Sequence, residues 1–243
     1  IEATERTLGL GSFSVHGDIV FDRGLPPLKL DNTYSGDFGV PVQASLGIAT
    51  PLAYAMSAGF DQLKIREIAV TIDASERKRV WQVDQVAVSK RDYHSGDDVQ
   101  LAVTLAGENG AELLRTATYR IPLGAPAGPL QFTVSDASTP NLTEYQEMAG
   151  AEPKSPAQLI ANLNRLRPNT GAYVRVWRPE PDFQIQGADL PDPPASITLL
   201  LARSQAAPNS VWLTRGSTLA ELAIDIGDAV VTGSKTVQVD VRP

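Results

Sequence analysis

The sequence predicts a mainly β protein, and two observations carry this prediction. Apolar residues alternate with polar ones along Val99–Leu105 and again along Leu130–Val134, which is the spacing of strands that bury one face. Turn-forming residues flank these runs, at Glu108-Asn109-Gly110 and in the Gly/Pro-rich stretch Gly124–Pro129. Alternating runs that are joined by short turns indicate antiparallel strands.

We predict two units within the 243 residues. Residues 1–79 form a smaller β-rich unit with one short helix. Residues 80–243 form an antiparallel β-sandwich, Ig-like or similar, with a two-helix insertion near 140–168. The boundary is placed at Glu76–Arg79, where polarity rises sharply. A chain of this length can bury a substantial core without disulfides or metals.

In the N-terminal unit, paired strands are predicted over Thr7–Leu30, with Gly17-Asp18 as a turn or bulge between two apolar runs. Asp31–Gly39 is rich in Gly, Asp and Ser, which predicts a polar loop. A short helix is expected to begin at Thr50-Pro51, because Thr caps helices and Pro suits the first helical position. Ile65–Ile72 then has the composition of a strand.

The second unit begins with a strand over Trp81–Val88, whose apolar phase slips by one after Val83 and so predicts a bulge. More strands are predicted toward the C-terminus, the last two as a pair joined through Gly227 and Gly233. An extended connector is expected at Leu190–Pro194. These C-terminal strands are Tyr173–Trp177, Phe183–Ile185, Ile197–Leu201, Leu219–Ile226 and Val237–Val241.

Two helices are predicted before these C-terminal strands. Asn141–Glu144 and Ser155–Gln158 both have the capping-box pattern of a helix start. Gly150 is expected to end the first helix and Pro168 the second. The second helix has an apolar stripe at helical spacing. The residues of this stripe are Leu159, Ile160, Leu163 and Leu166.

The composition excludes several classes of function. A net charge of -7 argues against binding a phosphate backbone, so we expect no nucleic-acid partner. The absence of cysteine excludes disulfides, Cys-zinc sites and thiol catalysis. No apolar run approaches the length of roughly 18 residues that spans a bilayer, so we expect no membrane-spanning segment. Nucleotide-binding, zinc-protease and serine-hydrolase motifs do not occur, and we expect no cofactor and no metal.

Candidates for acid–base chemistry are few, because His16 and His94 are the only histidines. Ser14, His16 and Asp18 would share one strand face. Neighbours on such a face stand roughly 6–7 Å apart, whereas the partners of a catalytic triad touch at about 2.6–3.2 Å. We therefore interpret this face as an ordinary polar one and predict no catalytic residue. A hydrolase with an unrecognised carboxylate site is an alternative, since any of 28 acidic residues could pair.

Five residues are candidate ligand contacts. His94, Asp97 and Asp98 lie in or beside a turn, where a solvated loop is the ordinary interpretation and a contact to a cation or a substrate is the alternative. Trp177 and Arg178 combine an aromatic ring with a guanidinium, as a site for carbohydrate or peptide does. Packing in the core is the alternative interpretation for the tryptophan.

Several segments together resemble one family. They are His94–Val99, Tyr119–Pro122 with the Ala-Pro-Ala-Gly loop after it, Asn162–Leu166 and Tyr173–Trp177. These segments are similar to the C-terminal region of large exported bacterial proteins, in particular acidobacterial ones, that carry an N-terminal SpoIVB-type S55 serine peptidase domain. The resemblance spans most of the chain and implies an extracytoplasmic location, in the periplasm or at the cell surface.

The chain departs from this family at the catalytic motif. The S55 peptidase places its serine in a Gly-Met-Ser-Gly-Ser-Pro type motif, whereas Ser12, Ser217 and Ser234 follow glycines without these flanking residues. The resemblance therefore implies a non-catalytic accessory module that binds or scaffolds a protein, a peptide or an envelope glycan. A structural spacer is an alternative. Because the chain begins with Ile1 rather than Met, we expect a peptidase domain, if there is one, to lie upstream.

Overall fold

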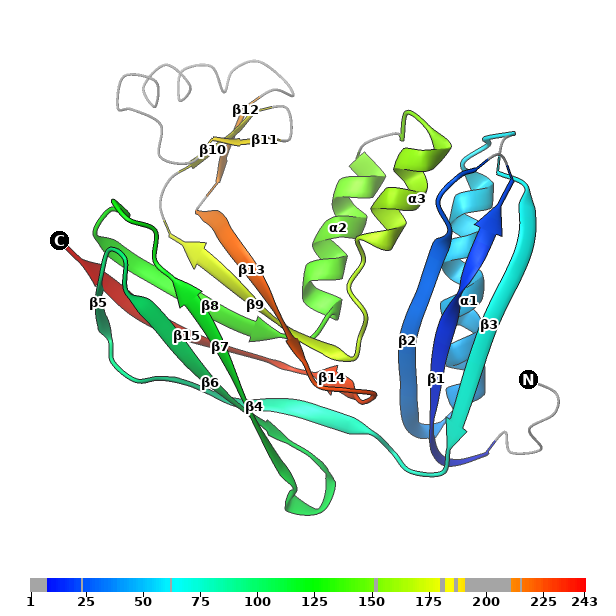
Figure 1. Cartoon of the computed structure of the whole chain (residues 1–243), viewed down its shortest axis with the longest axis horizontal. Coiled ribbons are helices and arrows are strands. Elements are labelled where there is room, and N and C mark those ends of the chain that lie inside the picture. The colour runs from blue at the N-terminus through cyan, green and yellow to red at the C-terminus, as the bar shows by residue number, and fades with distance from the viewer. Residues whose placement is uncertain are drawn as a thin grey trace.

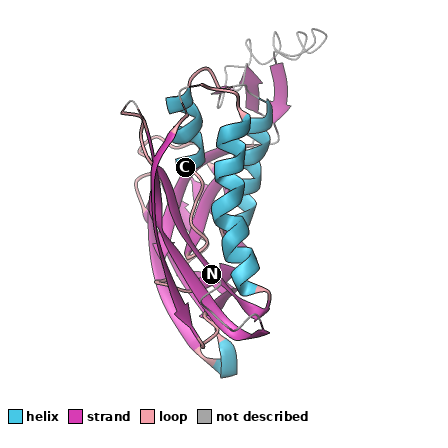
Figure 2. Cartoon of the chain, turned by 90° about the vertical axis from the view of Figure 1, so that its right-hand side faces the viewer, coloured by secondary structure: helices cyan, strands magenta, loops and turns pink. Residues whose placement is uncertain are grey.

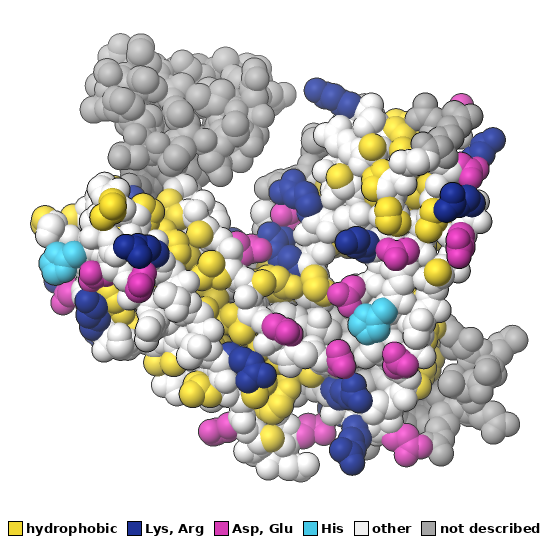
Figure 3. All heavy atoms as spheres, in the orientation of Figure 1, with side chains coloured by type: hydrophobic (Ala, Val, Ile, Leu, Met, Phe, Trp, Pro, Cys, Tyr) yellow, Lys and Arg dark blue, Asp and Glu magenta, His cyan; other side chains and the backbone are white. Residues whose placement is uncertain are grey.

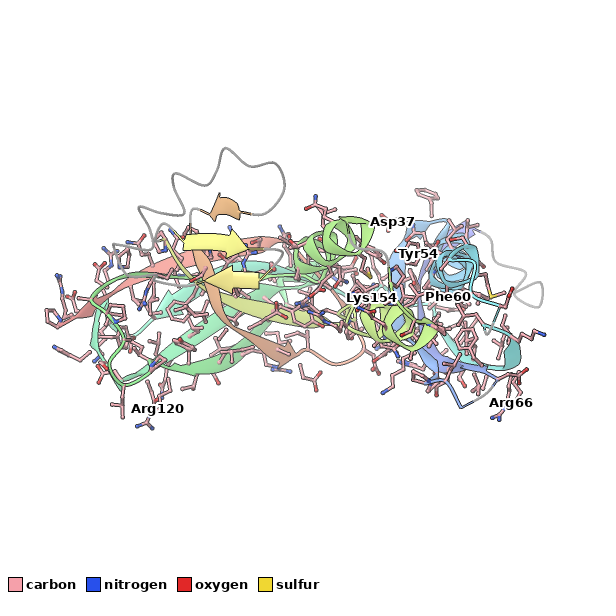
Figure 4. All side chains as sticks on the ribbon, turned by 90° about the horizontal axis from the view of Figure 1, so that it is seen from above. Asp37, Tyr54, Phe60, Arg66, Arg120 and Lys154 are labelled. Atoms are coloured by element: carbon pink, nitrogen blue, oxygen red, sulfur yellow. The ribbon has the colours of Figure 1, made fainter. Side chains whose placement is uncertain are left out.

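The computed structural model describes residues 8–22, 24–61, 63–150, 153–179, 182–185, 188–190, 211–214 and 216–243. Most elements of the described part are strands, which confirms a mainly β protein. A three-stranded sheet occupies one end of an elongated molecule and two larger sheets occupy the other (Figure 1). Figure 4 places Arg66 and Arg120 toward these opposite ends. Among the described helices, none has the length and apolarity of a bilayer span.

The three-stranded sheet has the order β2-β1-β3 and antiparallel pairing. One prediction for it is wrong: β1 continues through Gly17 without a turn, and Gly17 pairs with both Leu30 and Val70. The central strand needs glycine here, because an added Cβ would lie 2.1 Å from the carbonyl oxygen of Ala69. The strands are β1 (Leu8–Phe21), β2 (Leu28–Phe38) and β3 (Ile65–Ser75).

The predicted polar loop at Asp31–Gly39 is also wrong, because most of this segment belongs to β2. Its polar residues alternate and lie opposite polar residues of β1. Thr33 pairs with Ser14, and the two hydroxyls are 3.0 Å apart. The polarity of this segment therefore reflects a polar sheet face, and not a turn.

Helix α1 (Val40–Ser57) begins earlier than the predicted start at Thr50-Pro51, so Pro51 lies inside the helix. Gly39 precedes the helix with a left-handed φ of 67°, a conformation that suits glycine. Pro41 lies in the first turn, where its missing N–H costs no hydrogen bond. Pro41 and Pro51 are both suited to the first turn of a helix, and the sequence pattern alone does not decide at which of them the helix begins.

Two helices cover one face of the three-stranded sheet, α1 and α3 (Pro156–Asn164) (Figure 2). Helix α3 begins as predicted, since Ser155 Oγ accepts a hydrogen bond from Gln158 N at 3.2 Å. Three residues of α3, Leu159, Ile160 and Leu163, join Val15, Ile19, Phe21, Leu28, Leu30, Ala44, Ala55 and Leu63 in one core. This core therefore combines the N-terminal strands with a helix that follows much later in the chain.

The two larger sheets share a second core. In the five-stranded sheet the order is β13 (Ser217–Asp225), β9 (Gly171–Arg178), β8 (Gly128–Ser135), β15 (Ser234–Arg242) and β5 (Asp92–His94). In the four-stranded sheet it is β14 (Val230–Thr232), β4 (Val80–Val88), β6 (Asp98–Ala106) and β7 (Glu112–Arg120). Among these strands, β14 pairs with β4 and β15 with β5 in parallel, and the other pairs are antiparallel.

The alternating runs form β6, β7 and β8, as predicted. A register shift between Val83 and Gln85 confirms the bulge in β4. The predicted C-terminal pair is wrong, because β13 and β15 are separated by β9 and β8. Between them the chain crosses to the other sheet as β14, so its glycines do not close a hairpin. The alternating apolar residues are buried: Val99, Leu101, Val103, Leu105, Leu130, Phe132 and Val134.

Helix α2 (Ser138–Gly150) begins three residues before the predicted cap at Asn141. Asp136 Oδ1 instead accepts from Ser138 N at 2.9 Å. The Asn141 side chain bonds the backbone of Arg167, with Nδ2 donating to its carbonyl oxygen at 2.9 Å and Oδ1 accepting from its N–H at 2.8 Å. Asn141 therefore ties α2 to the segment after α3, a long-range role that a capping pattern does not indicate.

A small antiparallel sheet has the order β11 (Ala188–Leu190), β10 (Asp182–Ile185) and β12 (Val211–Thr214). Strand β10 agrees with the prediction over Phe183–Ile185. The predicted strand Ile197–Leu201 and residues 191–194 of the predicted connector lie outside the described residues.

Two asparagines cover the outer edge of β2. Asn169 Oδ1 accepts from Thr33 N at 2.9 Å and Asn169 Nδ2 donates to Thr33 O at 2.6 Å, which copies the hydrogen bonds of a paired strand residue. Asn32 Oδ1 accepts from Asn169 N at 3.0 Å. Farther along, Asn164 Oδ1 accepts from Lys29 N at 2.9 Å. This edge is thereby joined to the segment that leads into the large sheets.

Candidate functional site

The candidate site is a recess lined in part by the loop between β7 and β8. Figure 1 shows this loop at one end of the large sheets. Its volume is about 290 Å³. One wall is the loop Pro122–Pro126, and the remaining lining comes from β7, β8, β9 and β13. The larger side chains in this lining are Tyr119, Ile121, Leu123, Leu130, Arg178 and Leu219.

The inner part of the recess is apolar with two polar groups. Tyr119 and Arg178 are each only 7% exposed, and Ile121 and Leu130 are fully buried. The Tyr119 ring packs edge-on against Phe132, with centroids 5.7 Å apart. Burial raises the pKa of Tyr119, and the nearby Arg178 charge partly offsets this effect. The Tyr119 hydroxyl has no hydrogen-bond partner among the described residues, and it is not one of their buried unpaired atoms, so it is open to the recess.

Leucines form the rim of the recess. Leu123 is 84% exposed and Leu219 is 37% exposed. Figure 3 shows hydrophobic side chains gathered on the surface of this end of the large sheets. A side chain such as Leu123 gains nothing from folding while it is exposed to water, and exposed apolar surface that adjoins a cavity is typical of a binding site.

The turn before β6 holds the recess loop in place. Ser95 Oγ donates to Pro122 O at 3.0 Å and accepts from Gly124 N at 2.6 Å. Ile121 N donates to Asp97 O at 2.9 Å. Of the predicted contact residues in this turn, Asp97 therefore supports the wall of the recess through its backbone.

Asp97 also fixes the shape of the turn. Its Oδ2 accepts from Lys90 Nζ at 2.9 Å and from His94 N at 3.0 Å. The hydrogen bond from Lys90, followed by the one from the His94 backbone, lowers the pKa of Asp97. The ionised carboxylate is the form that holds both partners.

Asp97→Asn is expected to remove an acid-dependent part of the stability. Because folding lowers the pKa of Asp97, its contribution is fully present above the unfolded pKa of about 4 and is lost as pH falls through the folded pKa. The difference in unfolding free energy between wild type and variant should therefore shrink from about pH 7 to about pH 3. Urea titrations at both pH values measure it. The exposed Asp98, changed to Asn, is the control, and a pH-independent difference for Asp97→Asn would contradict the prediction.

The other predicted contact residues are dispersed. His94 and Asp98 are exposed, and Asp98 lies opposite Arg120 at the start of β6. Trp177 and Arg178 are consecutive in β9 and so point to opposite faces of the sheet. Trp177 packs against Gly216, where an added Cβ would lie 2.2 Å from its ring. Of the five predicted residues, the recess directly includes Arg178 alone.

The predictions missed Tyr119 and Leu123 as site residues. In the sequence, Tyr119 resembles any residue of an alternating strand. Only the packing of two sheets against each other brings it near Arg178. Leu123 does carry a signal in the sequence. It is a large apolar residue between Pro122 and Gly124, in a loop where such a side chain has little chance of burial.

The histidine on the three-stranded sheet does not form a triad. His16 Nδ1 lies 2.9 Å from Asp31 Oδ1, whereas the Ser14 hydroxyl bonds Thr33. Figure 3 shows the two histidine side chains far apart. In the described part of the chain, no three His, Asp or Glu side chains are arranged to hold a metal ion.

A larger hollow of about 440 Å³ lies where the three-stranded sheet meets the large sheets. Lys78 lies 3.4 Å from Asp37 and 3.5 Å from Glu108, and its contact with Asp37 is the main cause of its raised pKa. The Trp81 ring packs on Gly107, where an added Cβ would lie 2.6 Å from Cζ3. Lys78 joins the two ends of the molecule and the Trp81 ring is packed within its own sheet, so we do not assign a ligand to this hollow.

Comparison of the chain with protein-family models, with curated protein sequences and with solved structures found no match. The resemblance to the C-terminal region of S55 peptidase proteins therefore stays a prediction.

Proposed function

We propose that this chain is a non-catalytic binding module and that its ligand occupies the recess. The observation that carries the proposal is the Tyr119 hydroxyl, which lines the recess on a side chain that is 7% exposed and has no partner among the described residues. This hydroxyl is not among the buried unpaired atoms of the described residues, so it is accessible from the recess and can bond a ligand in place of water. The exposed Leu123 and Leu219 supply apolar surface beside it.

The recess lining supports binding more than hydrolysis. The described residues of its lining include no Asp, Glu, His or Ser, whereas a hydrolase of the carboxylate type needs two carboxyl groups that face each other. The resemblance to exported S55 peptidase proteins supports a role as an accessory part of a larger extracytoplasmic protein. In such a protein, the module would present the recess to a protein or peptide.

We also propose that the two large sheets, whose strand pairs are mostly antiparallel, form a β-sandwich of the Ig-like type. Residues from both sheets fill one shared core, among them Leu101 of β6, Phe132 of β8 and Val176 of β9. Inward-facing apolar residues from two sheets are the defining feature of sandwiches. The recess would then lie at one end of the sandwich, where loops between strands commonly form binding sites.

Titration with N-acetyl-leucine methylamide, an uncharged apolar peptide unit, tests the proposal. A ligand of this size in an apolar recess should bind with a Kd of about 1 mM, within reach of NMR chemical-shift mapping. We expect shifts confined to the segment from Tyr119 to Leu130 and to the neighbourhood of Arg178. Leu123→Asp should remove these shifts, because an apolar ligand at the rim would have to displace water from the carboxylate, which costs free energy.

Leu114→Asp is the matched control. Leu114 is 63% exposed on β7, five residues and so roughly 17 Å along the strand from Tyr119. This variant should keep the binding of the wild type. The absence of shifts in the recess at saturating ligand, or equal loss of binding in both variants, would overturn the proposed function.

A further inference from the structure

Helix α1 has an exposed face that is apolar along the length of the helix. Val42 is 62% exposed, Leu46 is 57% exposed and Met56 is 47% exposed. Ala49 and Ala53 lie between the last two and are exposed as well. These five residues, called the α1 outer face below, recur at alternating spacings of four and three, which is the spacing with which one helix packs along another.

The opposite face of α1 is apolar too. It packs into the core of the three-stranded sheet, with Ala44 and Ala55 among its buried residues. A helix that is apolar all round is normally covered on all sides. Because the α1 outer face is exposed in the single chain, we infer that another molecule covers it.

Helix α1 has no Asp, Glu, Lys or Arg in its 18 residues. An average stretch of this length in a chain that is 20% charged contains roughly four such residues. Two copies of a chain with a net charge of -7 repel each other, and a helix without charge lets them meet without bringing like charges together. A lipid surface is less favoured, because helices that lie on membranes carry Lys and Arg on their polar face.

The order of side chains along the α1 outer face fits a second α1 that runs in the opposite direction. If Leu46 of one copy faces Met56 of the other, Ala49 also faces Ala53, because both pairs have the same midpoint in the sequence. Each contact then occurs twice about a two-fold axis, as a symmetric dimer requires. The small alanines at the centre allow the helix axes to approach to about 8 Å, so that the larger side chains on either side come into contact.

We propose that the α1 outer face is the interface between two copies of this chain, with the two α1 helices antiparallel. One face of an 18-residue helix, about 27 Å long and about 10 Å wide, supplies less than the about 800 Å² per partner of a standard interface. The dimer is therefore reversible, with an expected Kd of about 1–100 µM. Helix α1 lies at the end of the molecule away from the large sheets (Figure 1), so the dimer presents two recesses.

Sedimentation equilibrium of the full chain, from about 1 µM to about 500 µM at about 0.15 M salt, measures this dimer. Leu46→Glu should raise the Kd at least about 100-fold, because the carboxylate would be buried against Met56 without a partner. Leu142→Glu is the matched control, since Leu142 is 59% exposed on another helix, α2, and it should leave the Kd unchanged. Both side chains are exposed in the single chain, so both variants should keep the urea midpoint of the wild-type monomer at about 1 µM.

A pair of complementary variants tests the antiparallel arrangement. Leu46→Lys and Met56→Glu should each be monomeric alone, because each places an unpaired charge against an apolar side chain. In an equimolar mixture the new lysine of one chain faces the new glutamate of the other, while the second contact of the pair stays Met56 with Leu46. The mixture should therefore form a heterodimer, and its recovery shows that both variants are folded.

Four results would overturn the proposal. The wild type could stay monomeric at every concentration, or it could form a dimer that Leu46→Glu does not weaken. The mixture of Leu46→Lys and Met56→Glu could stay monomeric while the wild type dimerises, which would exclude the antiparallel contact. A monomeric chain that floats with neutral phosphatidylcholine vesicles, and no longer does so after Leu46→Glu, would show that a lipid surface covers the α1 outer face.

Discussion

Phe132→Ala is expected to lower the free energy of unfolding by about 3–5 kcal/mol, the largest effect that we predict for this protein. Phe132 is fully buried on β8, inside the five-stranded sheet. Its removal takes apolar area from the core and leaves a cavity that rigid sheets cannot fill. The Tyr119 ring also loses its edge-on partner, so the floor of the recess should loosen. Urea denaturation measures the change in stability.

Two variants make the comparison specific. Phe132→Leu keeps most of the volume and should cost less than about 1.5 kcal/mol. Leu114→Ala, at a side chain that is 63% exposed, should change stability by less than about 0.5 kcal/mol. A cost below about 1 kcal/mol for Phe132→Ala would show that β8 is not the centre of this core.

Asn169→Ala is expected to cost about 2–4 kcal/mol, the second largest effect. The variant loses the side-chain amide that bonds both the N–H and the carbonyl of Thr33. Thr33 is fully buried, so both backbone groups would lack a partner in the folded state, and unfolding would hydrate them. Chemical denaturation measures the loss, and amide hydrogen exchange at Thr33 should become faster.

Asn162→Ala is the matched control for this prediction. Asn162 is an asparagine of α3 whose side chain has no hydrogen bond to the described residues, and its replacement should change stability by less than about 0.5 kcal/mol. Asn169→Asp keeps the acceptor for Thr33 N and loses the donor to Thr33 O, so its cost should be intermediate. Equal stability of Asn169→Ala and wild type would contradict the strand-like role of this side chain.

The alternation and capping patterns of the sequence predicted the strands and helices that bury one apolar face. They did not predict strands with a polar face or pairings between distant segments. Strands β6 to β8 follow from strict alternation, and the start of α3 follows from Ser155 and Gln158. Strand β2 was missed because its polar residues meet polar partners on β1, which period-two hydrophobicity does not register. The separation of β13 and β15 depends on sheet order, which adjacent segments of sequence do not specify.

The candidate site was only partly predictable for the same reason. Arg178 was predicted as a contact from its chemistry, and the recess includes it. Trp177 and Arg178 were predicted to form one contact site because they are neighbours in the sequence, yet consecutive residues of a strand point to opposite faces of the sheet. Tyr119 belongs to the four-stranded sheet and Arg178 to the five-stranded one, so their proximity results from how two sheets stack. That is tertiary information, which a single sequence carries weakly.

The shared core of the N-terminal strands and α3 has a consequence for synthesis on the ribosome. Leu163, the last α3 residue of that core, is made 84 residues after position 79. At about 5–20 residues per second, this delay lasts about 4–17 seconds. During that time the newly made sheet has α1 but lacks α3, the second helix of its cover, and the asparagines that bond the edge of β2. A nascent chain in this state is a natural client for chaperones, so the yield of folded protein should depend on how fast translation reaches α3.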